Sequence, residues 1–143
     1  MPTEAEWEKA SRGQEGRIWP WGDQFIEGNC NSAESGIGST CPVELFSNGA
    51  SVYGAIHMIG NTWEWCLDFY DPYGHHYANR INPINTIPSR QRVVKGGSYY
   101  YDKTVCRCAG RDYINQNNEG GGDDGFRIAL RKINPQGKKL SII

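Results

Sequence analysis

The sequence lacks the features that would direct it to a membrane or to nucleic acid. It has no apolar run near the roughly 18 residues that a membrane-spanning helix requires, and its mean hydropathy is −0.65. Its 15 basic and 16 acidic residues nearly cancel, so no overall field attracts nucleic acid or anionic lipid. The first residues, Met-Pro-Thr-Glu, have neither the basic nor the apolar region of a signal peptide. We therefore expect a soluble cytoplasmic protein without a membrane span or a nucleic-acid partner, while display at a surface through another protein stays open.

The cysteine count excludes a monomer in which every thiol is paired. There are 5 cysteines, an odd number, and no export signal is visible that would favour disulfides. We interpret them as mainly reduced thiols. A bond between Cys30 and Cys41 across an irregular loop is the alternative that remains open.

Glycine and aromatic residues are abundant instead. The 143 residues include 18 Gly, 8 Tyr and 5 Trp, which provide turns with positive φ and large buried areas from few side chains. This composition suits one domain with short strands and many loops, and it argues against a helical bundle. Residues 133–143 are expected to be a basic, poorly ordered tail.

One helix is predicted near the start of the chain, over residues 2–13. Thr3 is a good N-cap, and Glu6 three residues later completes a capping box. Gly13 follows the last helical turn as a stop signal. Trp7 is expected to lie on the inward face of this helix.

Three strands are also predicted. Residues 63–69 alternate between apolar side chains and Glu64, Cys66 and Asp68, which indicates a half-buried strand with the apolar set facing the core. A second strand at 93–94 leads into Gly-Gly-Ser, where the backbone must pass close to another group. Residues 125–130 are predicted to form a closing strand.

Short motifs in a particular order connect this chain to a known family. They are Pro-Thr-Glu-Ala-Glu-Trp-Glu (2–8), Arg-Gly (12–13), Pro-Trp-Gly (20–22), Pro-Val (42–43), Tyr-Gly (53–54), Gly-Asn-Thr-Trp-Glu-Trp (60–65), Lys-Gly-Gly-Ser (95–98), Arg-Cys-Ala-Gly-Arg (107–111) and Gly-Phe-Arg (125–127). The chain resembles the formylglycine-generating-enzyme (sulfatase-modifying-factor) family. The resemblance implies an α+β, C-type-lectin-like domain over residues 1–132 with one or two short helices, lacking the family's N-terminal half. In character it is closest to variable proteins diversified by retroelements.

The resemblance also implies where the family's oxidases hold copper. They use two cysteines shortly after Gly-Gly-Ser, because two soft thiolates bind Cu(I). Here the first position is Tyr101 and the second is Cys106, so the paired site is not supported. Cys108 matches a structural cysteine whose usual partner position is Ser11. Cys106 and Cys108 would share one face of a strand, where packing thiols are commoner than a metal site.

Calcium and iron sites are implied by the resemblance in the same way. The calcium ligands map to His57, Gly60, Thr62 and Glu64, but imidazole is a poor ligand for a cation that prefers oxygen. The second calcium site maps to Asn29, Cys30 and a position near Ser35, where the usual carboxylate is absent. The resemblance therefore favours calcium at Glu64, Gly60 and Thr62 less strongly than it would if the usual oxygen ligands stood at His57 and Ser35.

Iron-dependent relatives use a histidine triad on an N-terminal bundle. His75 and His76 are adjacent in a Pro/Gly-containing segment and have no metal-ligand spacing. We expect them in a surface loop.

The segment 99–125 favours recognition. It lies between Gly-Gly-Ser and Gly-Phe-Arg and is rich in Tyr, Asp, Asn and Gly, the residue types of antibody paratopes. In retroelement-diversified relatives this segment is mutated at adenines of Asn-type codons, and only Lys103, Gln116 and Glu119 fall outside the residue types that this process produces. The residues expected to face a ligand are Tyr100, Tyr101, Asp102, Thr104, Val105, Gly110, Asp112, Tyr113, Asn115, Asn117 and Asn118. The scaffold residues are Gly96, Gly97, Arg111, Phe126 and Arg127.

We therefore expect a non-enzymatic domain that binds a protein or another macromolecule through residues 99–124, without a cofactor. The structural alternative to ligand binding for this segment is that Tyr100 and Tyr101 pack on neighbouring loops. The functional alternative is a truncated or divergent copper-dependent oxidase that uses Cys106. If the chain is a fragment, Trp7 and Met58 are expected to expose apolar surface.

Overall fold

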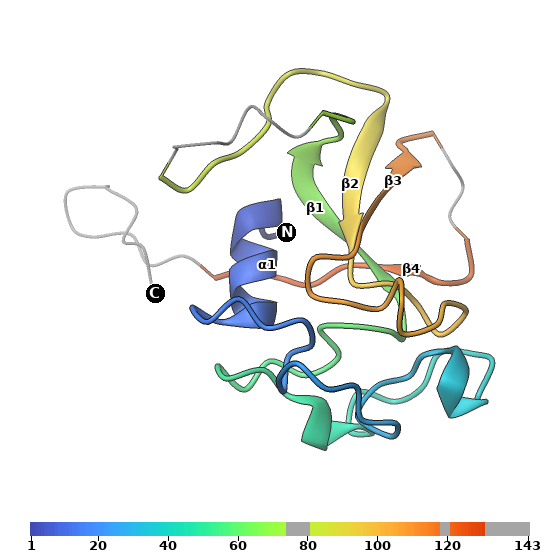
Figure 1. Ribbon diagram of the computed structural model, residues 1–143. Coiled ribbons are helices and arrows are strands. Elements are labelled where there is room, and N and C mark those ends of the chain that lie inside the picture. Colours follow the sequence, from blue (N-terminus) through green and yellow to red (C-terminus); the bar gives the residue numbers. More distant parts are fainter. Residues whose placement is uncertain (74–80, 118–120, 131–143) are drawn as a thin grey trace.

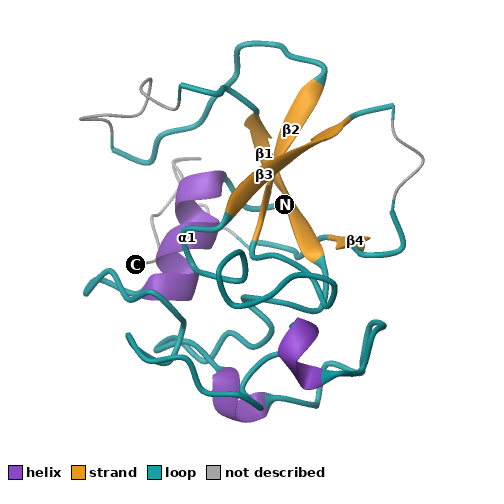
Figure 2. Ribbon diagram, turned by 45° about the vertical axis from the view of Figure 1, so that its right-hand side comes forward, coloured by secondary structure: helices purple, strands orange, loops and turns teal. Residues whose placement is uncertain are grey.

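The computed structural model describes residues 1–73, 81–117 and 121–130 (Figure 1). Within these residues one α-helix, α1 (Glu4–Arg12), packs beside a small sheet, and long irregular segments form a separate layer beneath both. The strands are β1 (Trp63–Phe69), β2 (Gln91–Lys95), β3 (Arg111–Asn115) and β4 (Asp124–Gly125). Two 3₁₀ turns, Ala33–Ser35 and Ser47–Gly49, lie within the loop layer (Figure 2). The predicted tail at 133–143 lies outside the described residues, as do His75 and His76.

Helix α1 begins and ends as its sequence predicts. The Thr3 hydroxyl accepts a hydrogen bond from the Glu6 N–H at 3.1 Å, and the Glu6 carboxylate accepts one from the Thr3 N–H at 2.8 Å. This reciprocal pair is the predicted capping box. Gly13 ends the helix with φ 70° and donates to the carbonyl of Lys9.

The four strands are ordered β3-β2-β1-β4. Strand β2 pairs antiparallel with both β1 and β3, whereas the two-residue β4 pairs parallel with β1. Strand β3 is therefore an edge strand. The prediction of a closing strand over 125–130 is wrong, because the strand ends at Gly125 and residues 126–130 belong to no regular element.

Beyond the buried Trp63, the burial of β1 is the reverse of what its alternation predicts. Glu64, Cys66 and Asp68 are buried, whereas Trp65 and Leu67 are only half-buried. The reason is that helix α1 covers the polar face of the strand and provides partners for both carboxylates. The side chain of Glu64 accepts from the Trp7 indole, and that of Asp68 accepts from the first helical N–H.

Two buried clusters form the core. The first, beneath α1, contains Trp7, Met58, Cys66 and Val93. The second, in the loop layer, contains Cys30, Ile59 and Cys106 with partly buried aromatic rings around them. Trp7 and Met58 are each 1% exposed, so neither side chain contributes exposed apolar surface.

The Gly-Gly-Ser segment crosses between the two clusters with no space for side chains. A Cβ on Gly96 would lie 2.9 Å from the Met58 carbonyl oxygen, and one on Gly97 would lie 2.6 Å from the Cys106 sulfur. Both glycines also have positive φ, 96° and 75°. The predicted close approach is confirmed, and it ties the end of β2 to both clusters.

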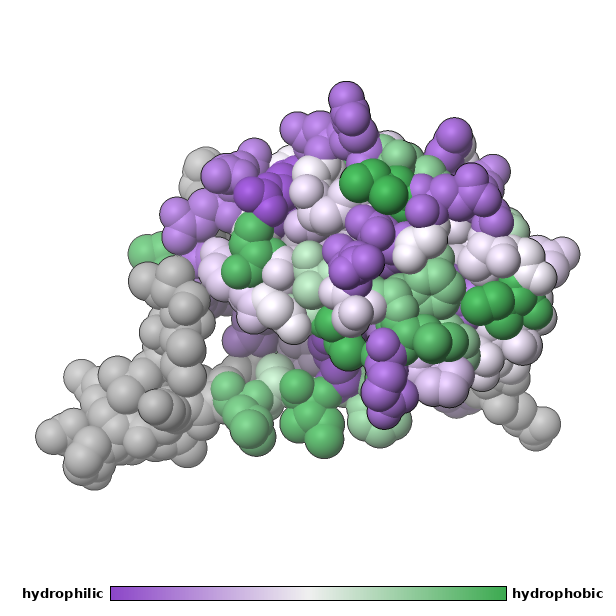
Figure 3. Space-filling model, turned by 90° about the horizontal axis from the view of Figure 1, so that it is seen from below, coloured by the Kyte–Doolittle hydropathy of each residue, from purple (hydrophilic) through white to green (hydrophobic). Residues whose placement is uncertain are grey.

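Exposed apolar side chains are scattered over the loop layer. Seen from below, they form separate patches among polar residues (Figure 3). They include Ile26, Ile37, Val43 and Leu45. Within the described part of the chain, no helix has the length and apolarity needed to cross a membrane.

Candidate ligand-binding site

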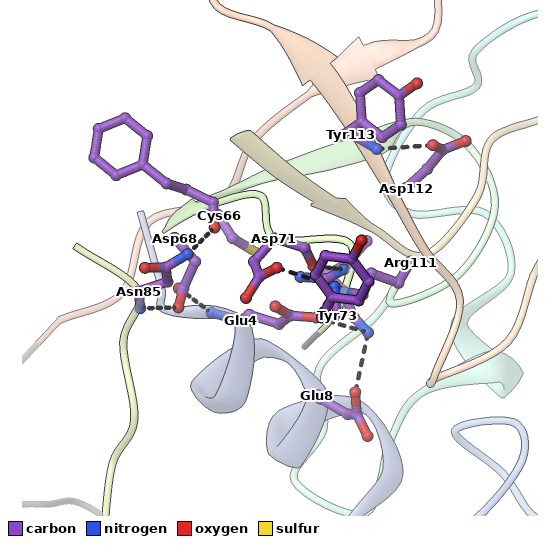
Figure 4. Close-up of polar contacts among 12 residues, drawn as sticks. Glu4, Glu8, Cys66, Asp68, Asp71, Tyr73, Asn85, Arg111, Asp112 and Tyr113 are labelled. Atoms are coloured by element: carbon purple, nitrogen blue, oxygen red, sulfur yellow. Dashed lines mark hydrogen bonds and ion pairs between the residues drawn. The ribbon is translucent and has the colours of Figure 1, made fainter. Parts of the chain in front are cut away.

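A polar network fixes β3 to the helix and to the segment that follows β1 (Figure 4). Arg111, at the start of β3, donates from Nε to Glu4 at 2.7 Å and from Nη1 to the Asp71 carbonyl oxygen at 3.0 Å. Its guanidinium also lies 4.6 Å from the centre of the Tyr70 ring. This side chain is scaffold, in agreement with the prediction, and it sets the position of the residues that follow it.

Asp68 organises the other side of this network. Its buried carboxylate accepts from the Glu4 N–H at 2.7 Å and from the Asn85 N–H at 2.8 Å (Figure 4). The Asn85 side chain in turn donates to the Phe69 carbonyl oxygen. A carboxylate at the first turn of α1 is favourable because the free N–H groups there carry partial positive charge. The helix, β1 and the segment before β2 are thereby joined.

The loop 99–110 is held by its own hydrogen bonds. One carboxylate oxygen of Asp102 accepts from the N–H and the hydroxyl of Thr104. These bonds lower the pKa of Asp102 below its ordinary value. The Lys103 N–H donates to Glu34 at 2.9 Å, and the Tyr101 carbonyl oxygen accepts from Ala33. The loop is therefore attached to the segment 33–34.

Three aromatic rings form a row on this loop and on β1. Tyr100 is 76% exposed, and its ring meets that of Tyr101 edge-on at 5.7 Å. Tyr101 meets the Trp63 ring at 5.5 Å and also packs against the cluster of Cys30, Ile59 and Cys106. The row thus runs from solvent into the core.

Strand β3 divides its side chains between two faces of the sheet. Arg111 and Tyr113 both contact Tyr70, on the side covered by α1. Asp112 lies opposite Val94 in the register with β2 and therefore points to the other face. The residues predicted on β3 consequently do not form one surface with the loop, and Asp112 alone shares a face with the aromatic row.

A small pocket of about 170 Å³ lies where this face meets the loop. Its lining comes from five separate segments: Trp63, Val94, Tyr101, Asp112, Tyr113, Ile114, Gly121, Asp123 and Asp124. The predicted site does not include Trp63. Asp123 and Asp124 fall within the predicted surface of residues 99–124 but are not among the residues named as facing a ligand.

The predicted ligand-facing residues differ in accessibility. Tyr100, Asp102, Thr104, Asp112, Tyr113, Asn115 and Asn117 are exposed, and Tyr101 and Val105 are half-buried. Gly110 is buried, and a Cβ there would lie 2.5 Å from the Val105 carbonyl oxygen, so its place is structural. Asn118 lies outside the described residues.

A larger pocket of about 400 Å³ lies along α1 and is also lined by Asp68 and Pro83. Its charged residues include Glu4, Glu8 and Arg12, and these form ion pairs with Arg111, Lys95 and one another. We interpret it as part of the helix-anchoring network.

The thiols do not form the arrangement that copper needs. Cys106 and Cys108 lie in a series of turns, so the expected strand with both on one face is wrong. Burial raises the pKa of Cys106 to about 12 and that of Cys108 to about 11. The nearby Ser11 side chain opposes the second shift. With Tyr101 beside Cys106 in place of a thiol, these residues do not fit a two-thiolate copper site.

The calcium positions are occupied by internal hydrogen bonds. Glu64 accepts from the Trp7 indole N–H at 2.6 Å, and both of its oxygens accept from Arg127. The His57 ring bonds to the Leu45 carbonyl oxygen, and the Gly60 carbonyl oxygen accepts from the Thr62 N–H. At the second mapped site Ser35 donates to Asn31. This donor set does not fit calcium.

Comparisons with known proteins identify the scaffold. The chain is 37% identical over 148 residues to the formylglycine-generating enzyme of Bos taurus and 35% identical over 147 residues to that of Streptomyces coelicolor. Each match covers 90% of this chain but only 38% and 46% of the relative, so the chain spans less than half of their length.

Solved structures share the fold. PvdO from Pseudomonas aeruginosa matches with a TM-score of 0.73 and Treponema denticola variable protein 1 with 0.69, each at 24% identity over 88% of this chain and covering 50% and 45% of those chains. The family model described as "Sulfatase-modifying factor enzyme 1-like domain" matches residues 1–132. The chain therefore belongs to the formylglycine-generating-enzyme (sulfatase-modifying-factor) family, with its α+β fold.

Proposed function

We propose that this protein is a non-enzymatic binding domain that recognises a macromolecular partner, in the first place a protein, through the surface of residues 99–124. The observation that carries the proposal is the position of Tyr101. It stands where the resemblance puts the first copper thiol, and its ring joins Tyr100 and Trp63 in one aromatic row. A bulky ring at this position provides contact area for a partner in place of a thiol that would bind copper.

The physical character of the surface supports this proposal. Tyrosine provides large, rigid, amphipathic contact area with few rotatable bonds, so little conformational entropy is lost on binding. Asp102, Thr104 and Asp112 provide exposed polar groups around the row. The scaffold beneath is rigid because Gly97 and Cys106 are in close contact and the loop is bonded to Glu34.

The similarity of fold to Treponema denticola variable protein 1 is consistent with a diversified surface. If residues 99–124 are diversified by a retroelement, the genome carries a near-identical template repeat beside a reverse transcriptase. The template differs from this coding sequence at adenines. Absence of such a template removes diversification from the proposal and leaves the binding function.

Peptide selection tests the binding function directly. A random peptide library is selected on the immobilised protein, and the enriched peptides are measured by calorimetry against wild type, Tyr100→Ala and Tyr53→Ala. Tyr53 is an exposed tyrosine in another loop, 47% exposed, and is the matched control. We expect Tyr100→Ala to weaken binding at least roughly fivefold, about 1 kcal/mol, and Tyr53→Ala to leave it unchanged. Peptides that bind both variants equally well would contradict the proposed surface.

Copper-dependent oxidation of a peptide cysteine is the second candidate function. It is favoured by the identity to formylglycine-generating enzymes and by Cys106 at the second thiol position. Cu(I) added to the reduced protein tests it, with thiolate–copper absorption and peptide oxidation as the two readouts. Stoichiometric copper binding with turnover overturns the binding-only proposal.

A further inference from the structure

We propose that the 170 Å³ pocket beside Tyr101 binds a positively charged side-chain end, ammonium or guanidinium, presented by the partner. This inference rests on the proposed binding function and names the chemistry of one contact within it. The pocket combines two features that each favour a cation: aromatic walls and carboxylates at its rim.

The aromatic walls come from Trp63 and Tyr101. Their rings form a T-shaped pair, 5.5 Å apart at 72°, in which the edge of one ring lies against the face of the other, and both residues line the pocket. The negative face of an aromatic ring attracts a cation within about 6 Å, most strongly for tryptophan. Tyr113 also lines the pocket, but its ring packs on Tyr70 on the other side of the sheet.

The carboxylates come from Asp112 on β3 and from Asp123 and Asp124 at β4. Each accepts a hydrogen bond from within the chain: Asp112 from the Tyr113 N–H, Asp123 from the Ser98 hydroxyl and Asp124 from the Gly121 N–H. These bonds hold the three side chains at the pocket. Burial and the neighbouring charge of Asp123 raise the pKa of Asp124, which is the effect expected where like charges lack a counter-ion.

Basic side chains of the protein near the pocket form ion pairs with glutamates outside it. Lys95, Arg111 and Arg127 lie on or next to the same strands, but they pair with Glu8, Glu4 and Glu64, respectively. Over the described ranges, no ion pair involves any of the three aspartates. A cation from a partner would therefore meet uncompensated negative charge.

The size and arrangement of the pocket select the kind of cation. Pockets for whole small molecules usually measure about 300–1,000 Å³, so this one accommodates the end of a side chain. Within residues 1–73, 81–117 and 121–130, no group of three or more His, Cys, Asp or Glu side chains has an arrangement that could hold a metal ion. The pocket therefore suits an organic cation better than a metal.

A titration followed by NMR tests the inference. The probes are the N-acetyl methylamides of lysine and arginine, with that of norleucine as the uncharged control. We expect lysine or arginine to shift the Trp63 indole resonance and the Gly121 and Asp124 amide resonances, with saturation at millimolar concentration. Norleucine is expected to shift none of them.

Charge-removing variants give the second readout. Asp124→Asn and Asp112→Asn are each expected to weaken binding of the cationic probe roughly threefold, and Asn keeps an oxygen for the existing hydrogen bond. Asp23→Asn is the matched control, because it removes the same charge from an exposed aspartate that accepts a backbone hydrogen bond but lies outside the pocket and the proposed surface. Equal shifts by norleucine, no shifts by any probe, or equal weakening by Asp23→Asn overturns the inference.

The two proposals fail in different ways. If selected peptides bind and lose affinity in Tyr100→Ala, but replacing their basic residues with norleucine changes nothing, the cation pocket is wrong and the binding function stands. If no peptide depends on Tyr100, the binding function itself is wrong.

Discussion

Arg127 and Glu64 form a two-pronged ion pair that joins the segment after β4 to the start of β1. The guanidinium donates from Nε to one carboxylate oxygen at 2.5 Å and from Nη2 to the other at 2.6 Å. The Trp7 indole N–H reaches the same carboxylate at 2.6 Å. Three of the motifs that carry the family resemblance, Thr-Glu-Ala-Glu-Trp, Trp-Glu-Trp and Gly-Phe-Arg, therefore meet at one side chain. Their spacing in the sequence reflects a structural junction.

The substitution Glu64→Gln is expected to destabilise the fold by about 3 kcal/mol, because it leaves Arg127 without its counter-charge in a mostly buried junction. The measurement is the free energy of unfolding in urea. Glu15→Gln is the control, since it breaks the ion pair between Glu15 and Arg17 at an exposed site, where the expected change is within about 0.5 kcal/mol. An equally small effect for both would show that the junction contributes little.

Calcium is expected to leave the melting temperature of the wild-type protein unchanged. A ligand stabilises a protein only if it binds the folded state preferentially, and the Glu64 carboxylate already accepts three hydrogen bonds. The measurement is thermal unfolding in a chelator and in millimolar calcium. A clear rise in calcium would mean that the metal displaces Arg127 or binds elsewhere.

The ion pair between Glu8 and Lys95 should give a measurable dependence of stability on pH. Burial acts to raise the pKa of Glu8, but the charges and hydrogen bonds of Lys95 and Arg12 outweigh it and lower the pKa below its ordinary value of 4.5. A lowered pKa in the folded state means that the stabilisation is complete above pH 4.5 and is lost as the pH falls through the folded-state value.

Glu8→Gln is therefore expected to cost about 1–2 kcal/mol at pH 7, since Lys95 is almost fully buried while the Glu8 side chain is partly exposed to solvent. The difference from wild type should remain constant from neutral pH to about 5.5 and shrink below 4.5. Urea unfolding at a series of pH values measures it. A difference that is the same at pH 3.5 and pH 7 would contradict the assignment.

Ser11→Cys is expected to form a disulfide with Cys108. The two side chains are both buried and neighbour one another, and the resemblance places the usual partner of Cys108 at this position. Mild oxidation should lower the mass of the variant by about 2 Da, the two hydrogens lost when a disulfide forms. It should also raise its melting temperature, because the cross-link restricts the unfolded chain. Ser51→Cys, at another buried serine, is the control and should remain reduced.

Local patterns in the sequence predict which residues form helices and strands better than they predict which side chains of those elements are buried. The capping box of Thr3 and Glu6 predicts helix α1 correctly, because a cap is formed by residues three positions apart. The alternation in β1 predicts a strand but assigns the wrong face to the core. Glu64 and Asp68 are buried because Trp7, Arg127 and the first turn of α1 supply their hydrogen bonds. No pattern within residues 63–69 contains that information.

In the candidate site as well, a residue placed by a local motif can be predicted from the sequence, whereas residues brought together by strand pairing cannot. Tyr101 stands out in the sequence, because its position after Gly-Gly-Ser is set by a motif. Asp123 and Asp124 do not, because their meeting with Asp112 depends on the parallel pairing of β4 with β1 and on the register of β3. The composition of 99–125 predicts recognition as a whole, but it cannot show that Asp112 and Tyr113 point to opposite faces of an edge strand.

Tyr101→Cys should create a Cu(I) site that the wild-type protein lacks. The Cys106 thiol donates to the Tyr101 carbonyl oxygen at 3.3 Å, so a side chain at 101 begins close to that sulfur. A single buried thiol with a pKa of about 12 is protonated at neutral pH and holds copper poorly. Two soft thiolates can share one Cu(I) ion, and its binding energy offsets their deprotonation.

Competition with a chromogenic Cu(I) chelator, together with thiolate–copper absorption, measures this change. The variant should retain about one copper per chain at chelator concentrations that strip the wild type. Tyr101→Ser loses the same ring contact with Trp63 and controls for the loosened loop. Adding Cys106→Ser to Tyr101→Cys should abolish the site. If the wild type holds copper as tightly as the variant, Tyr101 does not separate this chain from the family's oxidases, and the oxidase alternative becomes the better account of its function.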